Sequence, residues 1–330
     1  MDIQRMVLVL IFGMSAVFLW TEWQRFTNPQ PPAAQRAAAP ATGAPAPATA
    51  GTPPASPVPV PLASPGSVAA PAVAGAPSGE RITVETDLLR VVVNTAGGII
   101  EEADLKTQQG TLDKNQPYQL LLNSKDRLHM AQAGLLGEGL PNHRTEYAAQ
   151  PGPHKLDGAE SVQLRLSAPI TQGPSAGGRV DQILTFKKGS YVIDVAFEIT
   201  NASQAPMSAT AYYHLLRDSK KPEGESSMVP AYTGATLYDE ADKFKKLDWS
   251  DIEKKKAKFT ARTDNGWVAM VEHYFVAAII PPEKTEREVY VDKVDDLYRV
   301  GVKIASQSIA PGATGRVGVS LYLGPQLQET

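Results

Sequence analysis

The sequence predicts a mainly β protein, in which one large antiparallel sandwich follows a single membrane helix and a disordered linker. Three observations predict this arrangement. An uncharged apolar run lies at 6–20, a segment rich in proline and alanine fills 28–79, and short β-branched runs separated by turn residues occupy 80–325. Strands at this density, with few helical intervals between them, favour a sandwich.

The apolar run 6–20 is the only stretch without a charge or a proline that is long enough to approach a bilayer crossing. A spanning helix needs roughly 20 apolar residues, so the aromatic side chains of Trp23 and Phe26 must be counted with it. A cleaved secretory signal is the alternative, because Arg5 precedes an apolar core of suitable length. Cleavage requires small residues directly behind the core, and bulky or charged residues stand there instead. The sequence therefore favours an uncleaved anchor over 1–27.

The segment 28–79 contains 14 of the chain's 27 prolines, a single charge at Arg36 and no aromatic residue. Such a composition buries too little apolar surface to offset the roughly 1–2 kcal/mol per residue that ordering the backbone costs. We expect a disordered tether, and a flexible chain of about 50 residues spans roughly 40 Å. A ligand for a proline-binding domain is the alternative at 57–61, but no basic residue flanks that run.

Alternating and β-branched runs predict strands throughout 80–325, and Gly97 and Gly98 mark a turn between two of them. The expected strands lie at 82–84, 88–93, 99–100, 162–166, 182–186, 191–200, 209–216, 267–280, 288–291, 298–305 and 316–323. The clearest hairpin joins 182–186 to 191–200 through the turn 187–190. Alternate residues of its second strand are apolar and predict one buried face, namely Tyr191, Ile193, Val195, Phe197 and Ile199.

One interval, 239–259, has the composition of a helix, because it is rich in Lys, Glu and Asp. Ser250 and Glu253 have the spacing of a capping box before a run of lysines. We expect a short surface helix there. The lysines 254–256 are expected to form a solvated face, with a patch for acidic partners or lipid headgroups as the alternative.

The composition excludes several classes of function. A net charge of −3 and the absence of a basic block interleaved with aromatic residues argue against nucleic-acid binding. The absence of cysteine excludes disulfides, thiolate zinc sites and a cysteine nucleophile. No nucleophile elbow or phosphate-binding loop occurs. The histidines have no metal-binding spacing; they are His129, His143, His154, His214 and His273. The sequence therefore shows no enzyme and no catalytic, cofactor-binding or metal-binding residue, although a carboxylate pair assembled by the fold stays open.

Two further features give expectations about particular residues. Trp267 stands in the apolar run 266–270, so it is expected to lie in the core, where its replacement by alanine costs about 3–5 kcal/mol. The charged interval 203–258 is expected to form part of a partner surface, because polar excursions on a rigid sandwich commonly carry binding.

A series of short motifs runs along the chain in a fixed order. They are Met1-Asp2-x-Gln4-Arg5, Asn28-Pro29-Gln30-Pro31, Thr86-Asp87-x-Leu89, Val93-Asn94-Thr95-x-Gly97-Gly98, Lys187-x-Gly189-x-Tyr191, Gly266-Trp267-Val268-Ala269-Met270, Tyr274-Phe275, Ile280-Pro281 and Leu321-Tyr322-Leu323-Gly324-Pro325-Gln326. In order and spacing, these motifs resemble the amino-terminal part of the bacterial membrane protein insertase family YidC, of the Gram-negative type. The resemblance covers the chain apart from the linker and 203–258.

This resemblance implies an inner-membrane anchor with a cytoplasmic amino terminus and a periplasmic β-supersandwich over 80–325, similar to galactose mutarotase-like folds. Residues 326–330 then begin the connection to a membrane domain that the chain does not contain. Family members insert nascent inner-membrane proteins into the bilayer, alone or with the Sec translocon, and the periplasmic domain is implicated in contact with the SecD–SecF complex. Insertion belongs to five further helices with an essential arginine, so no residue here inherits that role and no cofactor is implied.

Two other readings stay open on the sequence. A membrane-tethered periplasmic carbohydrate-binding or mutarotase-like protein is suggested by fold analogy. A structural spacer without a ligand fits the same residues.

Overall fold

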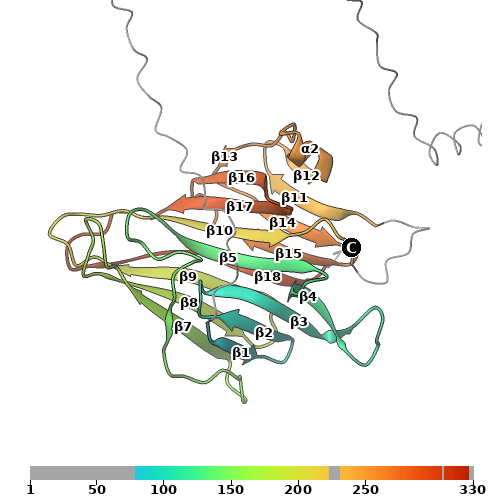
Figure 1. Cartoon of the computed structure of the whole chain (residues 1–330), viewed down its shortest axis with the longest axis horizontal. Coiled ribbons are helices and arrows are strands. Elements are labelled where there is room, and N and C mark those ends of the chain that lie inside the picture. The colour runs from blue at the N-terminus through green and yellow to red at the C-terminus, as the bar shows by residue number, and fades with distance from the viewer. Residues whose placement is uncertain (1–78, 223–230, 307, 327–330) are drawn as a thin grey trace, which may run out of the picture. The chain divides into compact units, whose positions relative to one another are not determined.

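Two nine-stranded antiparallel sheets make up the computed structural model of the chain, which describes residues 79–222, 231–306 and 308–326 (Figure 1). The first sheet contains β1 (Arg81–Glu85), β2 (Leu89–Asn94), β3 (Ile99–Gln109), β4 (Pro117–Asn123), β5 (Leu128–Leu136), β10 (Thr210–Arg217), β13 (Arg262–Thr263), β16 (Arg287–Val294) and β17 (Leu297–Ala305). The second contains β6 (Ala148–Ala149), β7 (Ser161–Pro169), β8 (Arg179–Lys187), β9 (Val192–Thr200), β11 (Thr233–Asp239), β12 (Lys243–Leu247), β14 (Trp267–Glu272), β15 (Phe275–Ile280) and β18 (Thr314–Pro325). The strand orders are β1-β2-β3-β4-β5-β10-β17-β16-β13 and β12-β11-β14-β15-β18-β9-β8-β7-β6.

Period-two alternation places one face of each sheet in a shared core. In β9 the alternate side chains Ile193, Val195, Phe197 and Ile199 are buried, which confirms the predicted hairpin face. The core joins the two layers directly, because the ring of Phe197 lies 5.8 Å from that of Tyr213 in β10 and the Tyr213 hydroxyl donates to the carbonyl of Val317 at 3.0 Å. The fold class expected from the sequence, a mainly β antiparallel sandwich, is therefore confirmed.

Most predicted strands are confirmed, but the prediction of one strand over 267–280 is wrong. Two strands, β14 and β15, occupy it and pair with each other around His273 and Tyr274. The turn contains no glycine or proline, and His273 adopts the left-handed conformation at a φ of 43°. The sequence therefore carried none of the usual turn signals.

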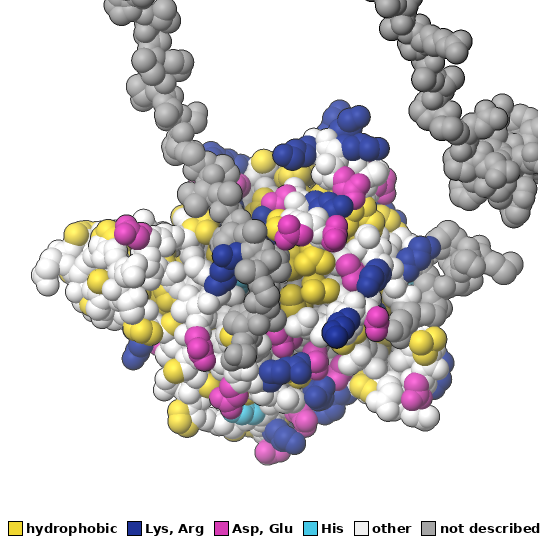
Figure 2. Space-filling model, in the orientation of Figure 1, with side chains coloured by type: hydrophobic (Ala, Val, Ile, Leu, Met, Phe, Trp, Pro, Cys, Tyr) yellow, Lys and Arg dark blue, Asp and Glu magenta, His cyan; other side chains and the backbone are white. Residues whose placement is uncertain are grey.

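The short surface helix predicted within 239–259 is present as α2 (Trp249–Glu253), but it takes up only five residues of that interval. The rest is not helical, because Asp239 ends β11 and Lys243–Leu247 form β12. The N-cap of α2 is Asp248, which makes no side-chain cap hydrogen bond, and Ser250 lies inside the helix, so the predicted capping box does not form. The lysines 254–256 that follow are exposed, and Figure 2 shows basic side chains gathered over this part of the molecule.

The interval 203–258 is not one polar excursion, because it contains β10 in the centre of the first sheet. Side chains of β10 such as Leu215 and Arg217 are fully buried there. The predicted anchor 1–27 and nearly all of the linker 28–79 lie outside the described residues. Within the described residues, no helix is long and apolar enough to cross a membrane.

Candidate functional site

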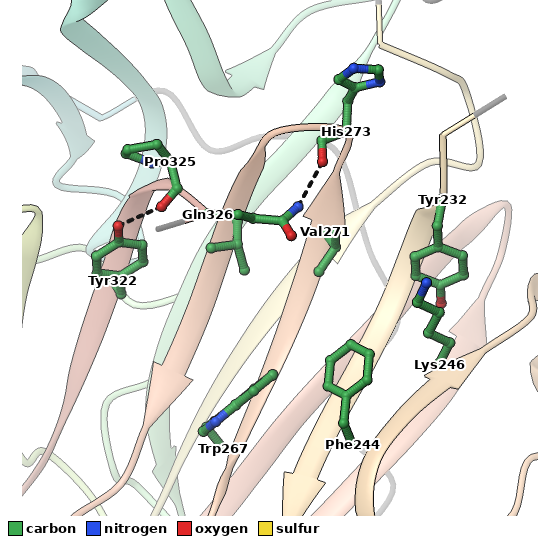
Figure 3. A pocket seen from close by; sticks show the side chains of 10 residues that line it. Tyr232, Phe244, Lys246, Trp267, Val271, His273, Tyr322, Pro325 and Gln326 are labelled. Carbon is green, nitrogen blue, oxygen red and sulfur yellow. Dashed lines mark hydrogen bonds between the residues drawn. The ribbon is translucent and has the colours of Figure 1, made fainter. Parts of the chain in front are cut away.

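The second sheet carries a groove on its outer face, the face turned away from the core. The strand order β12-β11-β14-β15-β18 sets its width. Val271 and Val276 are register partners on the two central strands and form its floor. The groove has a volume of about 580 Å³. Its lining residues, which define the aromatic groove, are Tyr232, Phe244, Lys246, Trp267, Val271, His273, Val276, Tyr322, Pro325 and Gln326 (Figure 3).

Aromatic side chains form one end of the groove. Trp267 is only half-buried, so the prediction that it is a core residue is wrong. Since Val268 and Met270 point into the core, alternation places Trp267 on the outer face. Its ring stacks on that of Tyr238 at 6.0 Å, with the planes 17° apart, and lies 6.0 Å from the ring of Phe244, which is 51% exposed (Figure 3).

The other end of the groove is held in place by polar contacts. Tyr232 bridges the ends of β11 and β12, because its hydroxyl donates to the carbonyl of Ala235 at 2.7 Å and accepts from the N–H of Leu247 at 3.1 Å. The Tyr232 hydroxyl lies 2.5 Å from where a Cβ on Gly234 would stand, so this close approach requires glycine. The Nζ atom of Lys246 lies 4.9 Å from the centroid of the Tyr232 ring. This geometry fixes the Tyr232 ring over the sheet.

The chemistry of the groove suits binding rather than catalysis. Aromatic and branched apolar groups dominate the lining. Among the described lining residues, Lys246 and His273 are the basic ones and none is a carboxylate. The Gln326 side-chain amide donates to the His273 carbonyl at 2.8 Å (Figure 3). Exposed aromatic rings with few charges are typical of surfaces that hold apolar segments.

A buried ionic cluster lies between the sheets, next to the groove. Glu272, the last residue of β14, is fully buried, and its Oε1 accepts from the Nη1 of Arg217 at 2.7 Å. The same oxygen lies 3.2 Å from the Nδ1 of His129, and Oε2 accepts from the Tyr118 hydroxyl at 3.0 Å. The carboxylate therefore ties β14 of the second sheet to three strands of the first, directly before the turn at His273.

Charge compensation keeps the cluster ionised. Burial by itself raises the pKa of Glu272, but the guanidinium of Arg217, the hydrogen bond from His129 and the more distant guanidinium of Arg127 outweigh it and hold the pKa at about 2. Burial lowers the pKa of His129, so the imidazole is neutral, and its Nδ1–H is shared between Glu272 and the Leu120 carbonyl, which lies 3.0 Å away. The cluster is thus a fixed carboxylate–guanidinium pair of Glu272 and Arg217, with the Arg127 guanidinium 3.9 Å from the carboxylate, and all three side chains are buried.

A second polar cluster lies on the outer face of the first sheet and brings two of the histidines together. The rings of His143 and His214 are 5.9 Å apart. The Nε2–H of His214 donates to Gln132 Oε1 at 2.8 Å, and its Nδ1 accepts from the Tyr290 hydroxyl at 2.9 Å. The Tyr212 hydroxyl accepts from the backbone N–H of His143 at 3.1 Å and donates to the ring of the same residue.

The two rings are neutral and sealed. Burial lowers the pKa of His214 well below its ordinary value. Burial, with smaller contributions from Arg144 and Arg299, lowers the pKa of His143 to about 4. Both ring nitrogens of His214 are already used in hydrogen bonds, and its side chain is 1% exposed. His214 therefore has no ring nitrogen left for a substrate.

Comparison with known proteins identifies the family of this chain. A sequence model described as "YidC periplasmic domain" matches residues 81–330. The chain belongs to the YidC periplasmic domain family. A protein named membrane protein insertase YidC from Nitrosospira multiformis is 42% identical over 342 residues, and one of the same name from Dechloromonas aromatica is 41% identical over 331. Both alignments cover 99% of this chain, which spans 59% and 58% of the relatives' own lengths.

Solved structures resemble the domain at low sequence identity. A galactose mutarotase related enzyme from Lactobacillus acidophilus has 11% identity and a TM-score of 0.48, covering 75% of this chain and 100% of its own. A putative aldose 1-epimerase from Escherichia coli has 12% identity and a TM-score of 0.45, covering 75% and 99%. Similarities of this size say nothing about a ligand or a reaction.

The histidines that the sequence singled out thus have different surroundings in this YidC periplasmic domain. His129 belongs to the buried ionic cluster, His143 and His214 to the His–Tyr cluster, and His273 to the groove. His154 is half-buried beside β1, where its carbonyl accepts from the N–H of Glu85 at 2.8 Å. Within the described ranges, no three His, Asp or Glu side chains are placed to hold a metal ion.

Sequence reasoning missed the groove itself. Phe244 and Lys246 fell in the predicted helix, and Trp267 was taken as core. The two apolar residues of that segment, Phe244 and Leu247, are three positions apart and do not follow the period of a strand, so no local signal identified β12. The lining residues come from β12, β14, β15 and β18 and from residues next to the ends of strands. They meet on one face only because of the strand order, which a single sequence does not reveal.

Proposed function

We propose that this chain is the amino-terminal portion of a membrane protein insertase, and that its periplasmic domain provides the contact surface for other polypeptides in the aromatic groove. The family match over 81–330 carries the first part of the proposal. The open, largely uncharged groove carries the second. Tyr232, Phe244 and Lys246 come from the interval 203–258, so the part of that interval that reaches the groove is the proposed partner surface.

The proposed organisation is an anchor over 1–27 in the inner membrane with a cytoplasmic amino terminus, a linker over 28–79 and a periplasmic domain over 80–325. Residues 326–330 begin the connection to the membrane domain. Expression of residues 80–325 alone tests the boundary, because an independent domain unfolds in one cooperative thermal transition. A segment that shows no such transition contradicts the boundary.

The proposed clients are nascent inner-membrane proteins, and the proposed partners are the Sec translocon and the SecD–SecF complex. The domain itself performs no reaction in this proposal and needs no cofactor. Insertion requires an enclosed, hydrated place in the bilayer, because each unsatisfied backbone group in hydrocarbon costs several kcal/mol. A single anchor and a domain outside the bilayer offer no such place. Residues 1–330 are therefore expected to bind partners without inserting clients.

Cells depleted of their own insertase and expressing only residues 1–330 test this division of labour. Insertion of a small dependent membrane protein is scored by protease accessibility, with a full-length insertase as the positive control. We expect no insertion, together with co-purification of the Sec accessory complex. Restored insertion contradicts the proposal. Loss of co-purification in a Phe244→Ser variant, but not in an Arg90→Ser variant on the outer face of the first sheet, assigns the contact to the groove.

A further inference from the structure

Two apolar side chains stand far out from the described surface on turns of the sandwich. Leu112, in the hairpin between β3 and β4, and Tyr274, in the turn between β14 and β15, are each 71% exposed. Neither turn needs an apolar residue for its own geometry, and neither side chain packs on the core. Single exposed apolar residues are ordinary, so their meaning depends on where they lie relative to each other.

The two turns lie at the same end of the sandwich. Pro117 begins β4 directly after the Leu112 turn, and the ring of the next residue, Tyr118, stacks on Phe275 with centroids 3.8 Å apart. Phe275 in turn follows Tyr274 and begins β15. The hairpin projects at the right of the view in Figure 1. The structure therefore brings Leu112 and Tyr274 to one end although they are distant in sequence.

The carboxyl-terminal end of the described chain leaves from the same place. β18 ends at Pro325, which is the register partner of Phe275. The backbone N–H of Gln326 donates to the Tyr274 carbonyl at 2.7 Å. This hydrogen bond fixes the β14–β15 turn beside the end of β18. A membrane surface that contacts Tyr274 therefore also lies next to Gln326.

The charged residues near Leu112 and Tyr274 are compatible with a lipid interface, but they do not make this end of the domain strongly basic. Lys114 and Lys125 are exposed at this end, with Asp113 and Asp126 beside them. Lysines of this kind extend along a headgroup layer while apolar neighbours enter it. Since the acids balance the lysines, apolar insertion rather than net charge has to supply the contact.

We propose that this end of the domain rests on the surface of a lipid bilayer, with Leu112 and Tyr274 in the interfacial layer. The sequence predicts an anchor at 6–20 and a linker of about 50 residues that spans roughly 40 Å. Such a tether keeps a bilayer at high effective concentration, so contacts by two side chains are sufficient for docking. The contact goes beyond the proposed function, because it does not depend on which polypeptide fills the groove.

The opposite end provides a matched control. The turn between β7 and β8 carries Ala176, which is exposed. Register places this turn at the far end, since Pro169 pairs with Arg179 and Thr200 pairs with Thr314, the first residue of β18. A probe at Ala176 therefore samples the same domain away from the proposed lipid surface.

The absence of cysteine from the chain permits single-site labelling. The full chain carrying Leu112→Cys, Tyr274→Cys or Ala176→Cys is labelled with an environment-sensitive fluorophore and reconstituted into vesicles of phosphatidylethanolamine and phosphatidylglycerol. Depth is read from the emission maximum and from quenching by headgroup spin-labelled lipid. Flotation of the labelled chain together with the vesicles confirms that the chain is bound to them.

We expect blue-shifted emission and lipid quenching at both tips, and water-like emission without lipid quenching at the Ala176 site. The same result is expected in vesicles of phosphatidylcholine alone, because the contact is apolar. Water-like emission at either tip overturns the two-point contact. Equal lipid quenching at all three sites overturns the end-on orientation, and a chain that does not float with the vesicles overturns the tethered docking altogether.

Discussion

The two outer faces of the sandwich differ in the exposure of their polar and aromatic side chains: the cluster on the first sheet is buried, whereas the aromatic groove on the second is open. On the first sheet, His143 and Tyr212 hydrogen-bond to each other, His214 hydrogen-bonds to Gln132 and Tyr290, and all three side chains are buried. On the second sheet, the rings of Phe244 and Trp267 lie 6.0 Å apart at the surface and line the open aromatic groove. Histidines with lowered pKa values usually attract attention as functional residues. Here they belong to a closed structural cluster, and the surface available for contact is the aromatic groove, which is lined mainly by aromatic and apolar side chains.

The largest effect is expected from the ionic cluster that supports the groove. Arg217→Met leaves the buried carboxylate of Glu272 without its nearest guanidinium, so the free energy of unfolding is expected to fall by about 3–5 kcal/mol. Urea unfolding of residues 80–325 measures this change. The double variant Arg217→Met, Glu272→Met is the control and is expected to recover most of the loss. A single variant as stable as the parent contradicts the cluster's structural role.

Acid is expected to weaken the same cluster. The pKa of Glu272 in the fold is about 2, below its ordinary 4.5, so ionisation of this group stabilises the folded state by roughly 3 kcal/mol. That stabilisation is fully present above about pH 5 and is lost as the pH falls toward about 2. Urea midpoints across this range measure it. Glu272→Gln is expected to flatten the profile, and an equally steep profile in that variant assigns the acid sensitivity to other carboxylates.

On the closed face, His214→Ala is expected to cost about 2–4 kcal/mol of stability, because it opens a cavity and removes the partners of Tyr290 and Gln132. Contact with polypeptides through the groove is expected to persist in this variant below its unfolding transition. Co-purification of partners with the folded variant measures this. If the folded His214→Ala variant no longer co-purifies with partners, the contact site is the His–Tyr cluster and not the groove.

On the open face, Trp267→Ala is expected to cost less than about 2 kcal/mol, because the half-buried ring loses only its contacts with Tyr238 and Phe244. A fully buried tryptophan costs about 3–5 kcal/mol. Chemical denaturation separates the two values. Partner binding is expected to fall although stability changes little, which is the reverse of the pattern at His214. A cost in the range of a core residue contradicts the groove assignment.

Sequence patterns correctly predicted the strands in which alternating apolar residues are also the residues buried in the core. In β9 every second side chain enters the core, so its strand and its buried face were both predicted. In β12 the apolar residues do not alternate and the lysines are good helix formers, so the local sequence favoured a helix and pairing with β11 decided the outcome. Trp267 was predicted on the wrong face because its apolar neighbours occupy both sides of β14.

The groove and the clusters depend on pairings that a single sequence does not contain. Glu272 and Arg217 are 55 positions apart, and nothing local to either residue indicates a buried ion pair. His143 and His214 are likewise distant and meet only because the loop around His143 folds over β10. The family resemblance predicted the fold in outline, but it assigned no residue to this surface.

Site-specific photo-crosslinking tests most directly whether the open groove, rather than the closed face, contacts polypeptides. A photoreactive residue is placed at Phe244 in the groove or at Arg90, which lies on the outer face of the first sheet with its side chain 40% exposed. Each variant is made in a full-length insertase, and a radiolabelled membrane protein is synthesised in its presence. Adducts with the labelled client are expected from Phe244 and not from Arg90. Adducts from Arg90 that equal or exceed those from Phe244 would contradict the account.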